Sequence, residues 1–388
     1  MENPKLRKMY QLNDNNKIVP VLSIESLPNE IFMNIFSNLN IKDLFKCAQV
    51  SKKFRQISYD KSFWKCVSLF NQKVSCEMIG HILSLGTEYL NLQRAKLYID
   101  WPSDIPPKNN LKYLNLAFSS VDDKFLVRLL RSSVSLEKIS LTGVNHEHLY
   151  GNFTRDYEGE DFHHDEEMLE IRRSWYIEVL LPNSKMLTSL DLSNSTEFYR
   201  SKLNSESIKA IVLNCVELKE ANFKSQIVLD RDVEFFVNNL TPKIEKLNIS
   251  DNEGFNDEHI ESLFKRCNNI TELDLHHCDQ ADDDSFDNED NEDNQSFLIA
   301  IAENLSQSLI KLQLPDHSFL YHEFIKSLPK LRYLWKEGGD ATEIMKQYPQ
   351  ISFNEGTAKI AHCANEYFEP EQGFWELKCA AVDLSRTR

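Results

Sequence analysis

The sequence predicts an α/β fold in which a solenoid of short parallel strands and covering helices follows a small helical domain. Three observations support this prediction. A strand-like leucine signature recurs at spacings between 22 and 51 residues, a helix-like apolar spacing precedes many of its copies, and a very apolar stretch, LPNEIFMNIF, occupies 27–36. A chain of 388 residues is also too long for one ordinary compact core, which favours several domains or a repeat array.

The strand signature reads L-x-x-L-x-L-x-x-N/C/S. Its clearest copies are LKYLNLAFS at 111, LTSLDLSNS at 187, IEKLNISDN at 244 and ITELDLHHC at 270, and weaker copies begin at Leu136, Leu218, Leu309 and Leu331. This is the strand signature of a leucine-rich repeat. We therefore expect each copy to form one short strand of a parallel sheet on the inner side of a leucine-rich-repeat solenoid.

Helices are predicted between these strands by apolar residues spaced i, i+3, i+4, i+7. The pattern occurs at Ile208/Ile211/Val212/Cys215, Val233/Phe236/Val237/Leu240, Ile260/Leu263/Phe264/Cys267, Leu298/Ile301/Ala302/Leu305 and Tyr321/Phe324/Ile325/Leu328. In each case the next strand signature begins 10 or 11 residues after the first member. The fixed offset predicts a solenoid over about 74–355, with helices outside, a degenerate first unit near Thr87 and a closing unit that leads into ISF at 351.

Polar residues between the leucines of the strands are candidates for binding a target, because solenoids present their concave faces to macromolecules. The candidates are Tyr113, Asn115, Lys138, Asp191, Asn222, Asn248 and Asp274. The alternative is that these side chains only keep the inner sheet soluble.

Two insertions interrupt the array. Residues 145–170 carry a net charge of −8 and residues 279–293 a net charge of −9, whereas the whole chain carries −16. The second insertion contains the carboxylates Asp282, Asp283, Asp284, Glu289 and Asp290. Both insertions follow a strand and precede a helix, so we expect an acidic rim on one edge of the solenoid. It either solvates the chain or attracts a basic partner, and it disfavours nucleic acid.

The segment 26–69 is expected to hold three short helices. Asn40, with Asp43 three residues on, suits the start of the second helix, and Ser51 suits the start of the third. The apolar residues of 27–36 cover most of the circumference of the first helix, whereas a surface helix normally buries one stripe. We therefore expect this helix to pack on the repeats on one side and on a partner on the other, with Phe63 and Trp64 bridging to the first repeat.

This segment resembles the F-box. The matching residues are Leu27-Pro28-x-Glu30-Ile31, Ile35-Phe36, Leu39, Asp43-Leu44, Val50-Ser51, Phe54-Arg55 and Ser62-x-Trp64. Together with the repeats, the chain is similar to the F-box and leucine-rich-repeat family. The resemblance implies an F-box domain at 23–70 in a substrate-recognition subunit of an SCF-type ubiquitin ligase. Such subunits dock on a Skp-type adaptor, which hangs from a cullin scaffold that carries the RING subunit.

The resemblance also implies the adaptor contacts. The family pattern places them on Leu27, Pro28, Ile31, Ile35, Leu44 and Val50, although some of these residues will belong to the domain's own core. The implied role is non-catalytic, without cofactor or metal, because the receptor holds a target close to a conjugating enzyme. The alternative, from a different class of function, is a binding scaffold or inhibitor in which the N-terminal helices only cap the repeats.

The remaining features suggest no other chemistry. The eight cysteines contain no C-x-x-C pair, so we expect free thiols that are mostly buried. No apolar stretch is long enough to span a membrane, and no signal peptide is recognisable, which favours the cytoplasm, the nucleus or both. Residues 1–22 are expected to be disordered, and the tail at 356–388 either folds over the concave face through Phe374 and Trp375 or is disordered.

Overall fold

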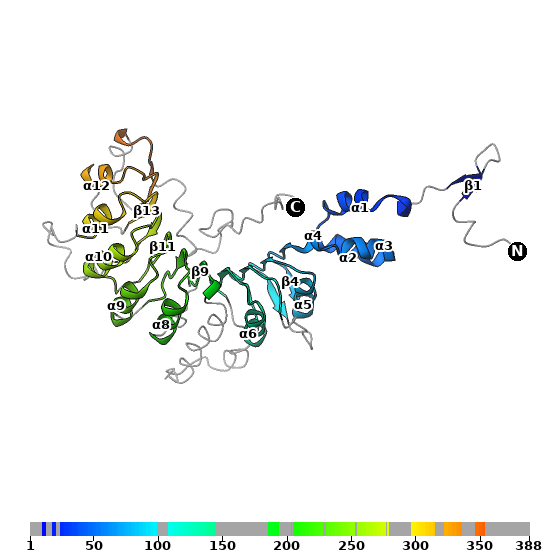
Figure 1. The fold of residues 1–388 in the computed structure, drawn as a ribbon, viewed down its shortest axis with the longest axis horizontal. Helices are drawn as coiled ribbons and strands as arrows, with labels where there is room; N and C mark the ends of the chain where they lie inside the picture. Colours follow the sequence, from blue (N-terminus) through cyan, green and yellow to red (C-terminus); the bar gives the residue numbers. More distant parts are fainter. Residues whose placement is uncertain are drawn as a thin grey trace, which may run out of the picture.

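The computed structural model of the chain is shown in Figure 1. It describes residues 10–12, 18–20, 24–98, 108–144, 185–193, 203, 205–227, 230–252, 254–276, 278, 296–314, 322–335 and 346–353. Within the segment 1–22, Tyr10–Leu12 (β1) and Ile18–Pro20 (β2) pair as a short antiparallel hairpin. None of the described helices is long and apolar enough to cross a lipid bilayer. Both acidic insertions and the C-terminal tail lie outside the described residues.

The N-terminal domain is helical. A 3-10 turn at Ile24–Ser26 precedes α1 (Asn29–Phe36), α2 (Ile41–Val50), α3 (Lys52–Ser58) and the short α4 (Lys61–Trp64). The predicted caps are confirmed, since Asn40 accepts a hydrogen bond from the backbone of Asp43 and Ser51 from that of Phe54. Each cap satisfies an amide that the helix leaves unpaired, which explains where α2 and α3 begin.

The solenoid is built on a sheet of 11 strands, in which the described neighbours are all parallel. Its strands are β3 (Cys66–Ser68), β5 (Tyr89–Asn91), β7 (Tyr113–Asn115), β8 (Lys138–Ser140), β9 (Ser189–Asp191), β10 (Glu220–Asn222), β11 (Lys246–Asn248), β12 (Glu272–Asp274), β13 (Lys311–Gln313), β14 (Tyr333–Trp335) and β15 (Ser352–Phe353). All predicted strands are present, and each pairs with the next without a shift in register. The first strand, β3, starts before the predicted beginning of the solenoid at 74.

The described helices of the solenoid are α5 (Cys76–Ser84), α6 (Asp123–Ser132), α8 (Ser205–Asn214), α9 (Asp230–Asn239), α10 (Asp257–Arg266), α11 (Ser296–Leu305) and α12 (His322–Ser327). Figure 1 shows them on the outer side of the curved sheet, as predicted, with a second small sheet of β4 (Lys73–Ser75) and β6 (Lys96–Tyr98) beside α5. The leucines of the strand signature and the described members of the apolar helix quartets belong to one continuous core or pack against it, and Tyr321 lies outside the described residues. Of the predicted closing unit that leads into ISF at 351, the structure describes residues 346–353.

The same turn follows six of the strands. Three residues after the strand ends, the backbone is left-handed, with φ between 53° and 56°, at Asn71, Arg94, Phe118, Gly143, Ser225 and Asp251. In each of these turns the left-handed residue donates its backbone N–H to a carbonyl of the next repeat, as Asp251 does to His276 (2.8 Å). These hydrogen bonds between repeats offset the cost of a left-handed backbone, which is about 1–2 kcal/mol for a residue other than glycine.

Candidate protein-binding surfaces

The first helix has two different apolar faces. Phe32 and Phe36 are buried and form edge-to-face contacts with Phe54 of α3, at centroid distances of 4.9 and 5.4 Å. Ile31 and Ile35, four residues apart and therefore neighbours on the helix, are 44% and 46% exposed. The buried face thus packs on the domain's own third helix, which corrects the expectation that it packs on the repeats. The other face is open.

The residues that the sequence assigned to adaptor contacts divide between core and surface. Pro28, Ile31 and Ile35 are exposed, Val50 at the end of α2 is 69% exposed, and Leu27 is partly buried against the core. Leu44 is only 3% exposed and joins the core. Leu44 therefore belongs to the interior of the domain rather than to its surface.

The structure adds two residues to this surface that the sequence analysis did not select. Ile24, in the turn before α1, is 60% exposed. The ammonium of Lys53 lies 5.0 Å from the ring centroid of Phe32 and donates to the carbonyl of Leu27 (2.6 Å). Lys53 thus ties the segment before α1 to α3, across a sequence separation that no local pattern indicates.

An aromatic cluster joins this domain to the first repeat. Trp64 is fully buried, donates from Nε1 to the carbonyl of Ser58 (2.7 Å), and lies against Phe45 and Tyr59. Phe45 and Tyr59 in turn contact His81 of α5, at centroid distances of 6.0 and 5.5 Å. Trp64 thus lies at the junction, as the sequence predicted. The ring contacts that cross the junction are made by Phe45 and Tyr59, which the sequence did not indicate.

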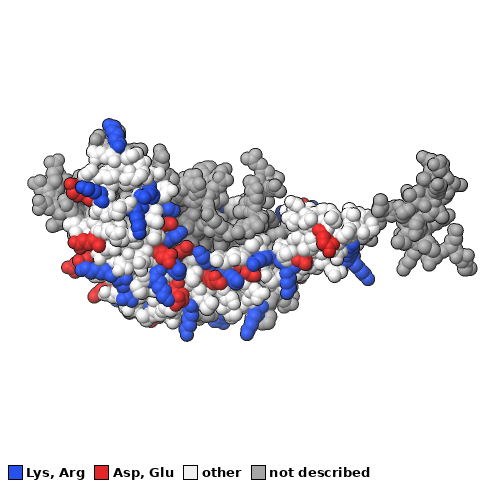
Figure 2. All heavy atoms as spheres, turned by 45° about the horizontal axis from the view of Figure 1, so that its top comes forward, with Lys and Arg blue, Asp and Glu red and all other residues white. Residues whose placement is uncertain are grey.

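On the concave face, the first residues of the strands form a row, which we call the first-position row. In strand order it contains Cys66, Tyr89, Tyr113, Lys138, Ser189, Glu220, Lys246, Glu272, Lys311, Tyr333 and Ser352. Ion pairs connect its centre: Lys138–Glu220 at 3.1 Å, Glu220–Lys246 at 3.8 Å, Lys246–Glu272 at 3.2 Å and Glu272–Lys311 at 3.2 Å. Figure 2 shows blue and red side chains interleaved along this part of the molecule.

The ion pair at one end of this chain spans a strand. Lys138 on β8 reaches Glu220 on β10, so the pair crosses β9, where the first-position residue is Ser189. The hydroxyl of Ser189 is fully buried and has no hydrogen-bond partner in the structure. A small residue is needed here because a longer side chain would stand between the lysine and the carboxylate.

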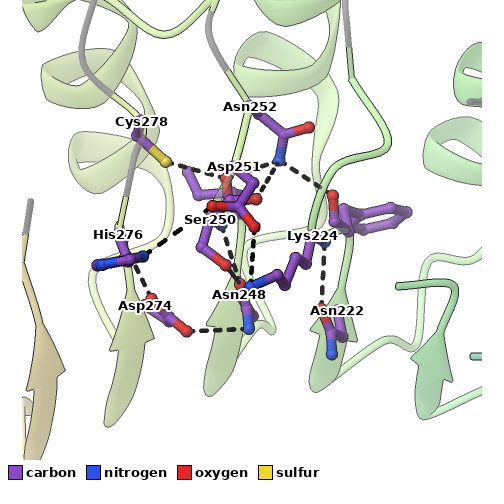
Figure 3. Close-up of polar contacts among 11 residues, drawn as sticks. Asn222, Lys224, Asn248, Ser250, Asp251, Asn252, Asp274, His276 and Cys278 are labelled. Carbon is purple, nitrogen blue, oxygen red and sulfur yellow. Dashed lines mark hydrogen bonds and ion pairs between the residues drawn. The ribbon is translucent and has the colours of Figure 1, made fainter. Parts of the chain in front are cut away.

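The last residues of the strands have an internal role. Asn115, Asp191, Asn222, Asn248 and Asp274 are all less than 9% exposed, and the side-chain oxygen of each accepts from the backbone N–H two residues on, at 2.9 to 3.1 Å. Figure 3 shows three of these contacts in neighbouring repeats. In the structure each of these five side chains thus makes an internal contact at the end of its own strand, and the prediction that they bind a target stays a prediction. Tyr113 and Lys138, at the first position, stay half-exposed.

Further contacts connect the turns beyond these strands (Figure 3). Lys224 forms an ion pair with Asp251 (2.8 Å), and Nδ1 of His276 lies 4.0 Å from the same carboxylate. Asn252 and Cys278 occupy the N/C position of the signature and donate to the carbonyls of Phe223 and Ile249, one repeat back (3.0 and 2.9 Å). The N/C position thus bridges neighbouring repeats.

No three His, Cys, Asp or Glu side chains among the described residues are placed to hold a metal ion.

The acidic rim is not tested by the structure. Asp282, Asp283, Asp284, Glu289 and Asp290 all lie outside the described residues, as do the remaining positions of 279–293 and all of 145–170.

Comparison with known proteins finds a family match for the N-terminal helical domain. A family model described as F-box-like matches residues 24–69. The ubiquitin ligase complex F-box protein UFO1 of Saccharomyces cerevisiae is 44% identical over 55 residues, which are 14% of this chain and 8% of that protein. F-box/WD repeat-containing protein 8 of Homo sapiens is 35% identical over 77 residues, which are 20% of this chain and 11% of that protein. The chain thus matches only a small part of these relatives.

Among solved structures, the chain is similar to a TLR13–ssRNA13 complex, with a TM-score of 0.37 and 16% identity over 70% of this chain and 34% of that one. It is also similar to a yeast complex of Rad7 and Elc1, with a TM-score of 0.39 and 15% identity over 83% of this chain and 86% of that one. The matched segment and the repeat geometry described above define the architecture, which is an F-box-like domain at 24–69 followed by a leucine-rich-repeat solenoid.

Proposed function

We propose that the protein is a substrate-recognition subunit of an SCF-type E3 ubiquitin ligase. Its F-box-like domain docks on a Skp-type adaptor, which connects it to a cullin scaffold and a RING subunit, and the repeat surface binds a protein target. In this role the protein catalyses no covalent step itself. It raises the effective concentration of a target lysine near the conjugating enzyme. A location in the cytoplasm or nucleus is part of this proposal.

The observation that carries the proposal is the open apolar face of α1. Ile31 and Ile35 are nearly half exposed although each is a large aliphatic residue, and they lie on a domain that matches the F-box-like model. Fully burying an exposed side chain of this size contributes about 1.5–3 kcal/mol, so covering the exposed part of each isoleucine contributes about 1 kcal/mol. We assign the adaptor surface to Leu27, Pro28, Ile31, Ile35 and Val50, and we leave out the buried Leu44.

The test is co-purification of the full chain with a Skp-type adaptor and a cullin. Ile31→Glu and Ile35→Glu should each lower recovery of the adaptor at least tenfold, because a charge would be buried in the interface. The matched control is Ile299→Glu, at a position on α11 that is 53% exposed. Equal recovery by the Ile31, Ile35 and Ile299 variants would contradict the proposal.

The alternative, a binding scaffold that the N-terminal helices only cap, is favoured by one observation. The matched segment 24–69 contains β3, which is the terminal strand of the solenoid sheet. The domain therefore does cap the repeats, and the scaffold hypothesis differs from the ligase hypothesis in requiring no adaptor. The same co-purification separates the two.

A further inference from the structure

The cations near the strand starts of the concave face are matched with carboxylates of adjacent repeats. In the first-position row, three lysines share two glutamates, as described above. The residues directly before the strands, which we call the preceding row, continue this pattern. Lys65 and Lys112 pair with Glu88 (3.5 and 3.2 Å), and Lys219 pairs with Glu245 (3.0 Å). Along most of the face, the charges thus compensate one another.

The turn before β14 departs from this pattern. Arg332 occupies the preceding row there, and its neighbours in that row are Ile310 and Ile351, which carry no charge. Lys330 lies two residues earlier in the same turn. Both side chains are exposed, and no carboxylate of the described residues lies within ion-pair distance of either. Glu272, on the second strand away, is already shared by two lysines, so positive charge is uncompensated at this end of the face.

Backbone contacts hold the two cations at one turn. Nη1 of Arg332 donates to the carbonyls of Pro329 (3.1 Å) and Leu331 (2.7 Å), which flank Lys330 in the chain. The ammonium of Lys330 donates to the carbonyl of Gln307 in the preceding repeat (2.5 Å). These contacts use only part of the donors of an arginine and a lysine side chain. The remaining N–H groups have no partner among the described residues, so they are open to an anion.

Two exposed apolar side chains lie beside this turn. Ile310 and Tyr333 are each 37% exposed, more than any other large hydrophobic residue that the structure describes in the preceding and first-position rows. They are neighbours of Arg332, because the backbone N–H groups of Arg332 and Tyr333 both donate to the carbonyl of Ile310 (2.8 and 3.1 Å). Open cations and open apolar surface thus coincide at one place, which we call the β13–β14 patch: Ile310, Lys330, Arg332 and Tyr333.

We infer that the β13–β14 patch is a subsite for a segment of the protein target in which an anionic side chain adjoins an apolar one. The anionic group is a carboxylate or a phosphate, because a guanidinium donates two parallel N–H groups to either. The apolar neighbour is favoured because it removes the exposed surface of Ile310 and Tyr333 from water. The inference rests on the proposed function only in taking the occupant to be a protein target. It places recognition at the opposite end of the sheet from the F-box-like domain.

The test is NMR of the full chain with ¹³C-labelled isoleucine methyl groups, in which Ile310→Val assigns the Ile310 signal. The probes are the capped peptides Leu-Glu-Leu and Leu-phosphoserine-Leu, and the control peptide is Leu-Gln-Leu, which is neutral and close in shape to the first. Because the chain carries a net charge of −16, it exerts no general attraction on anionic peptides, so their binding reports the local cations. Ile299 on α11, which is 53% exposed, is the internal control.

At least one anionic peptide should shift the Ile310 signal in a saturable way and leave Ile299 nearly unmoved, and the better-bound peptide identifies the preferred anion. Loss of one charge pair costs about fivefold in affinity, so Leu-Gln-Leu should bind about fivefold more weakly than that peptide. Arg332→Gln should weaken binding of the anionic peptide by the same factor. The matched control is Lys326→Gln, at an exposed lysine of α12, which should bind the anionic peptide as the wild type does.

The inference is wrong if neither anionic peptide shifts Ile310, if Leu-Gln-Leu binds as well as the better anionic peptide, or if Arg332→Gln leaves binding unchanged. Adaptor recovery is measured on the same preparation. Loss of adaptor binding would concern the proposed function, whereas a missing Ile310 response would concern only this subsite.

Discussion

Asp191 is a buried carboxylate that four hydrogen bonds hold inside the sheet. Oδ2 accepts from the hydroxyls of Thr142 (2.6 Å) and Ser140 (3.1 Å), and Oδ1 accepts from the hydroxyl (2.8 Å) and the backbone N–H (3.1 Å) of Ser193. Burial raises the pKa of this carboxyl although the hydrogen bonds oppose the shift. The charged form is therefore less favourable in the folded chain than in the unfolded one.

The consequence is a specific pH dependence. Between the ordinary pKa of Asp191, 3.8, and its raised folded value, the folded chain binds more protons, so the stability contribution of this group falls as pH rises through that window. An amide does not titrate. The melting temperature of Asp191→Asn, relative to wild type, should therefore increase as pH rises from 4 to 8. A difference that is independent of pH would contradict this.

Asp43→Asn serves as a control, because its effect on the melting temperature should change with pH in the opposite direction. The hydrogen bond from Lys46 lowers the pKa of the Asp43 carboxyl, so its stabilising contribution is present above the unfolded pKa and is lost as pH falls. The melting temperature of this variant relative to wild type should decrease slightly as pH rises.

The buried cysteines yield a second prediction at this scale. Burial raises the pKa of Cys215 and Cys267 to about 12, as expected for apolar helix positions that leucine fills elsewhere in the array. Because the thiolate is the reactive form, neither should react with maleimide at pH 8 until the chain unfolds. The half-buried Cys47 and Cys66 should react first. Peptide mapping by mass spectrometry checks the order, and labelling of all four at one rate would contradict it.

At the scale of the element, the turn that follows six of the described strands requires a left-handed backbone, and most of these turns adopt it without glycine. Gly143 is the exception among the six described turns. A side chain in the left-handed region costs about 1–2 kcal/mol. Gly143→Ala should therefore lower the unfolding free energy by about 1 kcal/mol once the stiffer unfolded chain is included.

The matched control for this prediction is Ser225→Ala, at the equivalent place in another repeat. Its φ is 56°, close to the 55° of Gly143, but Ser225 already carries a Cβ, so the substitution adds no backbone strain. Urea unfolding of both variants is the measurement. Equal loss of stability would indicate that the effect comes from packing and not from the backbone.

The ion pairs between first-position residues on the concave face give a second prediction at the scale of the element. Glu220 lies between Lys138 and Lys246, so Glu220→Gln removes two ion pairs at once. The pairs are only partly buried, and each is worth about 1 kcal/mol or less. We expect a loss of about 1 kcal/mol at low salt that shrinks in about 1 M salt, where exposed charges are screened. A loss that does not change with salt would contradict an electrostatic origin.

At the scale of the whole molecule, the F-box-like domain and the solenoid share a strand and a core. β3 pairs with β5 in the sheet, and the backbone N–H groups of Glu88 and Tyr89 donate to the carbonyl of Lys65 (3.0 Å each). The aromatic cluster around Trp64 continues into α5 through His81. The two parts are therefore expected to hold a fixed relative position.

Deletion of residues 1–69 should accordingly destabilise the solenoid and not only remove adaptor binding. It would expose the edge of β5 and the apolar surface of α5, and exposed sheet edges favour aggregation. We expect a lower melting temperature and loss of the monomeric state, measured by calorimetry and light scattering. If the chain without residues 1–69 stays monomeric and has the same melting temperature as the intact chain, the two domains are independent. For the same reason, Ile31→Glu and Ile35→Glu test adaptor docking more cleanly than the deletion does.

The sequence by itself determined the repeat, the positions of the solenoid strands from β5 and β7 to β15, and the buried faces of α8 to α12. These features follow from short-range periodicity, because each repeat between Leu111 and Leu331 buries apolar residues at the same spacing. The F-box-like segment was recognisable for the same reason, as its caps at Asn40 and Ser51 are local. What only the tertiary structure decided depends on contacts between distant residues. It sorted Leu44 into the core and Ile31 to the surface. It placed the strand-end residues, such as Asn248, in hydrogen bonds that end their strands, and it aligned Tyr89 with Tyr113. A one-dimensional pattern says which residues share a face, but burial depends on what the neighbouring repeat places beside them.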